Sequence, residues 1–181
     1  MRTFRSADFS DLAAVYRIQD NPFRQTALLS PLPSLERFLE TKTRDIQEGK
    51  EHLFVMENDG KLDGYVEFTL ANRFWVPAVW GVWLRTLIYA ASRVAFDVLN
   101  FPKVNWFVRR SNLRMIRLCE LFQFRETARE RFTAITEGFQ FIATGFVSIY
   151  ELTAEEFQGK SATLQRNAMQ FAFLDQKIHR V

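Results

Sequence analysis

Few side chains in this 181-residue chain are suited to chemistry, and the most informative are one glutamate and one cysteine. Glu67 lies in a segment of alternating polarity, on the strand face opposite Val66 and Phe68. A carboxylate there either takes up a proton in a reaction or is a solvated charge between neighbouring strands. Cys119 is the only cysteine, which excludes a disulfide within the chain. Its thiol can donate a proton, yet it lies on an apolar helical stripe and fits a small buried residue equally well.

The composition argues against several classes of function. With only two histidines, no metal-ligand cluster can be assembled. The formal net charge of +3 is too small to indicate nucleic-acid binding, although it is compatible with a local basic site for a phosphorylated ligand. The N-terminal residues lack the apolar core of a signal peptide, and Pro77 and Arg85 interrupt the longest apolar stretch. We therefore predict a cytoplasmic protein without a metal site and without a nucleic-acid or membrane partner.

The first part of the chain is predicted to contain two helices and several antiparallel strands. After a short edge strand at residues 1–5, helical spacing follows the N-caps Asp8 and Ser34, and Gly49 ends the second helix. Asp59-Gly60 is the strongest short hairpin signal, because both residues accept the backbone of a tight turn. Around this turn the apolar pattern predicts strands at residues 52–58, 62–70 and 72–76, the last ending at Pro77.

The rest of the chain alternates between helical and strand patterns. A helical stripe from Leu84 to Val98 joins the strand ending at Val76 to a strand near Val104, which requires a parallel crossover. A helix capped by Ser111 or Asn112 and two strands follow. We predict an α/β (α+β) fold with a mixed, mostly antiparallel sheet of about six to seven strands flanked by about four helices. Residues 1–157 form the domain, and residues 158–181 form a C-terminal tail with helical character.

The segment SNLRMIRLCELFQFRETARERF, from Ser111, resembles the second half of the core of the GNAT superfamily of N-acetyltransferases. The residues that fall in register with the family pattern are Asn112, Ile116, Leu118, Glu120, Phe124, Arg125 and Glu126. Segments near residues 1–16 and 95–108 also resemble the family, so the match covers most of residues 1–152. It is closest to the branch that contains ribosomal-protein N-terminal acetyltransferases and polyamine or antibiotic acetyltransferases. The resemblance implies a GNAT-like fold whose parallel strands splay apart at their C-terminal ends.

The resemblance also implies an activity, the transfer of an acetyl or other acyl group from CoA to a primary amine. The acceptor would be a small molecule, a peptide N-terminus or a lysine. Such a transfer needs a neutral amine, a polarised carbonyl and a proton donor for the leaving thiolate. The resemblance implies Glu67 as the base and Cys119, at the position of a family tyrosine, as the donor. The implied CoA-binding residues are Trp75, Val76, Gly81, Val82, Trp83, Leu84, Arg85, Thr86 and Asn112.

The segment that should hold the CoA pyrophosphate departs from the family pattern. In the family, the bare amides of a Gln/Arg-x-x-Gly-x-Gly/Ala loop hold the pyrophosphate at a helix N-terminus. Here the signature positions fall on Trp80, Trp83 and Arg85, and Gln123 replaces a glycine before Phe124. Two indoles would crowd a diphosphate, whereas Arg85 offers a charge-assisted contact.

Three alternatives therefore stay open for the function. The chain is an acetyl-CoA-dependent enzyme, a GNAT-fold binding or interaction module with impaired catalysis, or an enzyme that uses another acyl carrier. A second copy of the chain, as in a homodimer, is an expected partner. The apolar residues expected to dock on the domain or on that copy are Met169, Phe171, Phe173 and Leu174.

Overall fold

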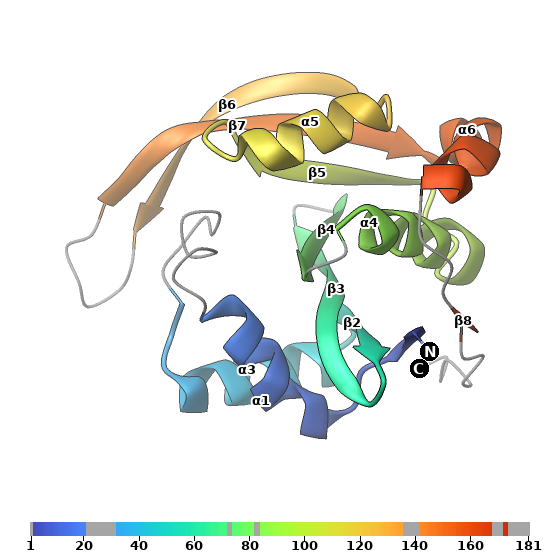
Figure 1. The fold of residues 1–181 in the computed structure, drawn as a ribbon. Helices are drawn as coiled ribbons and strands as arrows, with labels where there is room; N and C mark the ends of the chain where they lie inside the picture. Colours follow the sequence, from blue (N-terminus) through green and yellow to red (C-terminus); the bar gives the residue numbers. More distant parts are fainter. Residues whose placement is uncertain are drawn as a thin grey trace.

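The fold is built on one mixed sheet (Figure 1). The computed structural model describes residues 2–20, 32–71, 74–81, 84–135, 142–167 and 172–173. The strands are β1 (Arg2–Ser6), β2 (Glu51–Asn58), β3 (Lys61–Ala71), β4 (Phe74–Gly81), β5 (Lys103–Arg109), β6 (Arg125–Ile135), β7 (Ile142–Thr153) and β8 (Ala172–Phe173). Their order is β6-β7-β5-β4-β3-β2-β1-β8, and neighbours are antiparallel except for β4–β5 and β1–β8. The predicted mixed, mostly antiparallel sheet is confirmed, and the short β8 adds a strand to the expected number.

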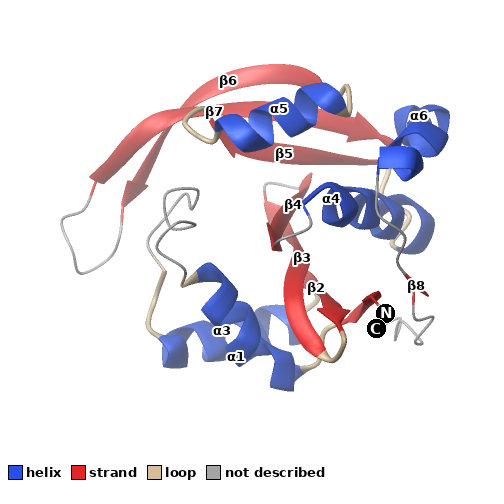
Figure 2. Cartoon of the chain, viewed as in Figure 1, coloured by secondary structure: helices blue, strands red, loops and turns tan. Residues whose placement is uncertain are grey.

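Helices cover both faces of the sheet, as Figure 2 shows. A short 3-10 turn (Phe9–Asp11), α1 (Leu12–Gln19) and α3 (Leu35–Gln47) pack on one face. The helices α4 (Leu84–Arg93), α5 (Leu113–Leu121) and α6 (Ala154–Asn167) contribute to the aromatic-rich core of the other, and α4 continues as a π-helical turn at Val94–Val98. No helix of the described part of the chain is long and apolar enough to cross a membrane.

Local sequence signals explain where the elements begin and end. The Asp8 carboxylate accepts a hydrogen bond from the Ser10 amide at 2.8 Å, and the Ser34 hydroxyl caps α3. The hairpin between β2 and β3 turns at Asp59 and Gly60, which have φ values of 50° and 77°. Gly49, with a φ of 69°, follows the end of α3, where the left-handed backbone suits a glycine. These predicted caps and turns are confirmed.

Alternation along β3 divides its side chains between the two faces of the sheet. Val66 and Phe68 belong to the aromatic-rich core beneath α4, whereas Tyr65 belongs to the smaller core beneath α1 and α3. Glu67 points to the same side as Tyr65, since successive strand residues face opposite ways. The pattern therefore places one carboxylate under α3, on the face with the smaller apolar core.

Two features differ from the expectations. Pro77 does not end its strand but pairs with Phe68 inside β4. Beyond Trp75, β4 pairs with β3 on one side and no longer with β5 on the other. A proline, which has no backbone N–H, is tolerated at such a strand edge. The segment expected as a tail begins inside α6, where Phe157 is buried against Tyr89 and Phe96. Whether residues 158–181 act as a separate unit stays a prediction.

Candidate functional site

The parallel strands β4 and β5 separate soon after they meet. They pair at Trp75 and Val104, and neither strand pairs with the other along the remainder of their described lengths. Their outer edges stay bonded to β3 and β7, and beyond Trp75 and Val104 the described edges that face each other form no ladder with one another. The predicted splay is confirmed. An extended molecule with amide groups can bond to such an edge.

The segment from β4 to α4 differs from the expected loop. β4 continues to Gly81 and α4 begins at Leu84, so the segment predicted as a loop is mostly strand. The residues between them, Val82 and Trp83, lie outside the described residues. Trp75, Val76 and Gly81 are placed in β4 by their backbone alone.

The N-terminal turn of α4 has the properties of an anion site. The helix dipole is positive at this end, which favours an anion there. Arg85 is exposed in this turn, and no acidic residue accompanies it. Leu84 is half-buried and Thr86 is 1% exposed, so the Thr86 side chain is not presented to a ligand at the surface.

Asn112 and Cys119 both lie on α5, but in different surroundings. The Asn112 side chain is half-buried and accepts a hydrogen bond from the Met115 amide at 3.1 Å, which caps the helix. Cys119 is 0% exposed in the apolar core. Burial, with a smaller effect of Glu120, raises the pKa of the Cys119 thiol to about 12. Its surroundings match the interpretation of a small buried residue.

Glu67 is not the solvated charge that its position on a strand suggests. It is 9% exposed, and its Oε2 lies 2.8 Å from the Lys42 ammonium of α3. The same ammonium contacts Oε1 of Glu51, at the start of β2, which is 3% exposed. Thr69 lies beside both carboxyl groups, with its hydroxyl 3.2 Å from Glu67 Oε1 and 3.4 Å from Glu51 Oε1. The structure thus groups two carboxyl groups and one ammonium beneath α3.

Sequence reasoning missed Lys42 and Glu51, although Lys42 carried a signal. It lies four residues after Phe38 and four before Ile46, on the stripe that faces the sheet. A lysine on an apolar stripe is buried only with a partner. Among the described ranges, no three His, Cys, Asp or Glu side chains are grouped to hold a metal ion.

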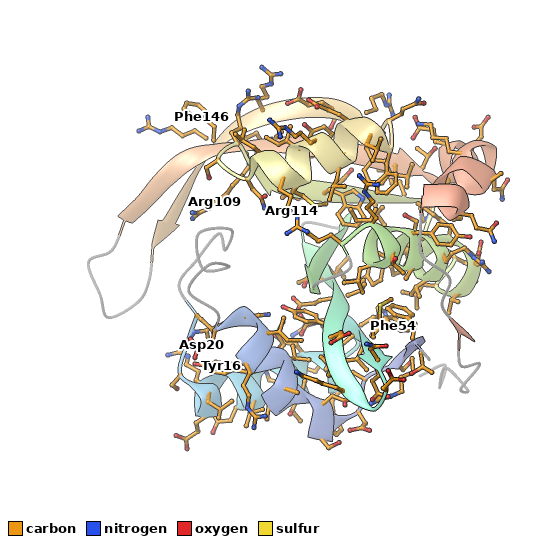
Figure 3. All side chains as sticks on the ribbon, in the orientation of Figure 1. Tyr16, Asp20, Phe54, Arg109, Arg114 and Phe146 are labelled. Atoms are coloured by element: carbon orange, nitrogen blue, oxygen red, sulfur yellow. The ribbon has the colours of Figure 1, made fainter. Side chains whose placement is uncertain are left out.

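Acidic residues are in excess in the first part of the chain and basic residues in the second. Residues 1–71 contain nine Lys or Arg and twelve Asp or Glu, whereas residues 72–181 contain fifteen and nine. Figure 3 shows Arg109 at the end of β5 and Arg114 on α5, and the Arg114 side chain points toward the part of the molecule containing β4. Tyr16 and Asp20 are labelled in that figure on α1 and at its end, in the acidic part. An anionic and a cationic ligand would therefore be favoured on different sides of the splayed strands.

Solved structures with the same fold include spermidine N-acetyltransferases from Vibrio cholerae. The complex with CoA and spermine matches with a TM-score of 0.72 and 21% identity, over 87% of this chain and 98% of that chain. A chimera of the enzyme with hSSAT matches with a TM-score of 0.71 and 21% identity, over 87% and 98% of the chains. A dodecameric structure in an intermediate state matches with a TM-score of 0.69 and 21% identity, over 88% and 98%. No protein-family model and no curated protein matches the chain. The structural likeness confirms the predicted GNAT-like fold.

Proposed function

We propose that this protein is an N-acyltransferase that moves an acetyl group from acetyl-CoA to a primary amine of a small molecule. The observation that carries the proposal is the separation of β4 from β5 beside the N-terminal turn of α4. One edge of this arrangement can bond the amides of a pantetheine arm, and the helix turn can bind a phosphate. A peptide N-terminus or a protein lysine is the alternative acceptor.

The residues present fit CoA, although they would hold it differently from a glycine-rich loop. CoA supplies the acyl group as a thioester. Its pantetheine arm would lie between β4 and β5 where these strands no longer pair with each other, near the half-buried Asn112. The pyrophosphate would depend on the positive end of the α4 dipole and on the exposed Arg85. A backbone amide of the splayed strands would polarise the thioester carbonyl.

The acceptor we favour is a polyamine. Residues 1–71 carry an excess of acidic side chains, which attracts a polycation. Spermine occupies the Vibrio cholerae structure of the same fold together with CoA, and this supports the polyamine side of the branch over the ribosomal-protein side. A second copy of the chain stays an expected partner, and one neighbour is described as dodecameric.

Glu67 is the side chain we propose to take the proton from the amine. It lies on β3 opposite Ala78 of β4, beyond the last pairing of β4 with β5. For the leaving thiolate, Cys119 is the predicted donor, but its complete burial supports a packing role for this thiol. A water molecule at the splayed strands can protonate the thiolate instead.

Binding of the acyl donor is tested by calorimetric titration with CoA. The activity is tested by an assay of acetyl transfer to spermidine. Removing one charge-assisted hydrogen bond costs about 1.5–3 kcal/mol, or roughly 10- to 150-fold in affinity. Arg85→Ala should weaken CoA binding by this factor without unfolding the protein, since Arg85 is exposed. The matched control is Arg93→Ala, in the last turn of the same helix, where Arg93 pairs with Asp97. If wild-type protein gives no heat with millimolar CoA, the chain is a binding module or uses another acyl carrier.

A further inference from the structure

We propose that Glu51 and Glu67 act together as one proton acceptor, positioned by Lys42, for the amine of the acyl-transfer reaction. This inference rests on the proposed function and deepens it. It replaces a single catalytic glutamate by a pair in which Glu67 faces the reaction and Glu51 acts through Glu67. Lys42 and Glu51 are accordingly positioning residues.

The geometry brings the two carboxyl groups to the same two partners. The Lys42 ammonium contacts Glu51 Oε1 and lies 2.8 Å from Glu67 Oε2. The Thr69 hydroxyl lies within 3.4 Å of one oxygen of each carboxyl group. Glu51 is opposite Thr69 in the register of β2 with β3, and Glu67 is two residues before Thr69 on the same face. Two acidic groups this close, on adjacent strands, affect each other's protonation directly.

Counting the charges of the cluster indicates a shared proton. Two ionised carboxylates and one ammonium would leave a net negative charge at a site where the carboxyl groups are almost fully buried. Burying an unbalanced charge is costly, so one carboxyl group keeps its proton. Burial and the neighbouring Glu67 raise the pKa of Glu51 to about 8. Burial alone would raise the pKa of Glu67 as well, but Lys42 and the hydrogen bond with Glu51 hold it below its ordinary value.

The described neighbours of Glu67 in the sheet add no further charge to the cluster. The residues opposite Glu67 in register are Leu53 on β2 and Ala78 on β4, and neither can ionise. On α3, the ring of Phe38 lies under the Lys42 ammonium, 5.7 Å from the ring centre. The nearest other titratable group on this face of β3 is Tyr65, whose hydroxyl accepts a hydrogen bond from Gln19 of α1. The pH response of the pair is therefore governed by Lys42 and by the two glutamates themselves.

The proton balance of the step follows from this arrangement. The acceptor arrives as an ammonium, and one N–H bond breaks as an O–H bond forms on Glu67, directly or through one water molecule. The neutral nitrogen attacks the thioester carbonyl carbon, so a C–N bond forms and the C–S bond breaks. The second proton leaves the nitrogen and reaches the sulfur through water. The pair later releases its proton to solvent. Because the pair accepts best after it has lost the proton held at neutral pH, the rate should rise with pH through about 8.

The experiment compares the pH dependence of kcat/KM for acetyl-CoA and spermidine between pH 6 and 10. Wild-type protein should show an inflection near pH 8, and Glu51→Gln should lose it while KM for spermidine changes little. Glu67→Gln should lower kcat by roughly 10²- to 10⁴-fold, the usual contribution of a general base. The control is Glu57→Gln. Glu57 lies on β2, as Glu51 does, but pairs with Arg5 outside the cluster, so this variant should keep the wild-type pH profile.

The possible results separate this inference from the proposed function. A Glu51→Gln protein with wild-type pH dependence overturns the shared acceptor but leaves acyl transfer intact. A wild-type protein that transfers no acetyl group overturns the proposed function, and with it the role given to the pair. Should Glu51→Gln fail to fold, infrared titration of wild-type protein serves as the test. A protonated carboxyl band that persists at pH 7 and disappears near pH 8 supports the pair, and its absence at pH 7 overturns it.

Discussion

The two faces of β3 differ in one respect: both bury apolar side chains beneath their helices, but only the face under α3 also buries charged groups. Toward α4, Phe68 packs edge-on against Phe54 and Phe101 in a core rich in aromatic rings. Toward α3, the neighbouring Glu67 is buried with an ammonium and a second carboxyl group. Burial of apolar surface stabilises the first face, whereas the second offsets a desolvation cost by pairing charges. The comparison indicates that the aromatic face contributes most to holding the fold together, whereas the charged cluster costs desolvation and is the part to which we assign the proposed chemistry.

The largest effect should come from removing an aromatic ring from the first face. Phe68 is 0% exposed, so Phe68→Ala leaves a cavity as well as losing transfer free energy. We expect a loss of about 3–5 kcal/mol in the free energy of unfolding, measured by urea denaturation. The control is Phe9→Ala, at an exposed position, which should change stability by less than about 0.5 kcal/mol. Similar losses for the two variants would contradict the assignment of stability to the aromatic face.

A smaller loss, dependent on pH, is expected on the polar face from Lys42→Met. Removing the cation leaves two buried carboxyl groups uncompensated, at a cost of about 3 kcal/mol near pH 8. Without Lys42, the folded-state pKa of Glu67 should rise above its unfolded value, and that of Glu51, which already lies above it, should rise further. Protonation then stabilises the folded state at low pH, and this stabilisation is lost as pH rises. The deficit measured by urea denaturation should therefore be smaller at pH 5 than at pH 8. Lys50→Met, at an exposed pair with Glu48, is the control and should show no such trend.

The smallest effect should come from Glu51→Gln, and we expect it in the pH dependence of the protein's stability. The folded-state pKa of Glu51, about 8, lies above its ordinary value of 4.5. Its proton therefore contributes stability that is fully present below pH 4.5 and is lost as pH rises through 8. Glutamine does not titrate, so the melting temperature of the variant should fall less than that of wild type between pH 5 and 9. Parallel curves in scanning calorimetry would show that Glu51 is ionised throughout.

Much of the fold could be predicted from sequence because local patterns agree with it. The caps at Asp8 and Ser34 and the turn at Asp59-Gly60 depend on neighbouring residues only. The alternation of β3 predicted which residues share a face, and the helix between β4 and β5 required a parallel crossover. Pro77 was interpreted wrongly, because a proline ends a strand only where its missing N–H is needed. Whether an N–H is needed at this position depends on where β5 lies, and local sequence patterns do not predict that.

The candidate site was predicted less completely, for a similar reason. Glu67 was singled out, but its partners come from α3 and β2, and the pairing is set by tertiary packing. Most glutamates in proteins are exposed to solvent. That expectation is wrong for Glu67 because a lysine, Lys42, lies on the apolar stripe of the covering helix and pairs with it. The segment around Gly81 was recognised as a poor match to a phosphate-binding loop. That this segment is mostly strand became visible only from the pairing of β4 with β3.

The burial of Cys119 has a consequence for how motions of the protein can be observed. The chain has one thiol, and it lies fully enclosed between α5 and the sheet. A thiol-reactive label can reach it only when α5 lifts or the domain unfolds, and the high pKa slows the reaction further. The rate of labelling under native conditions therefore reports the free energy of that opening, at one defined place, without an engineered probe. Ligands that bind across α5 and β4 should slow the labelling in proportion to the opening that they suppress.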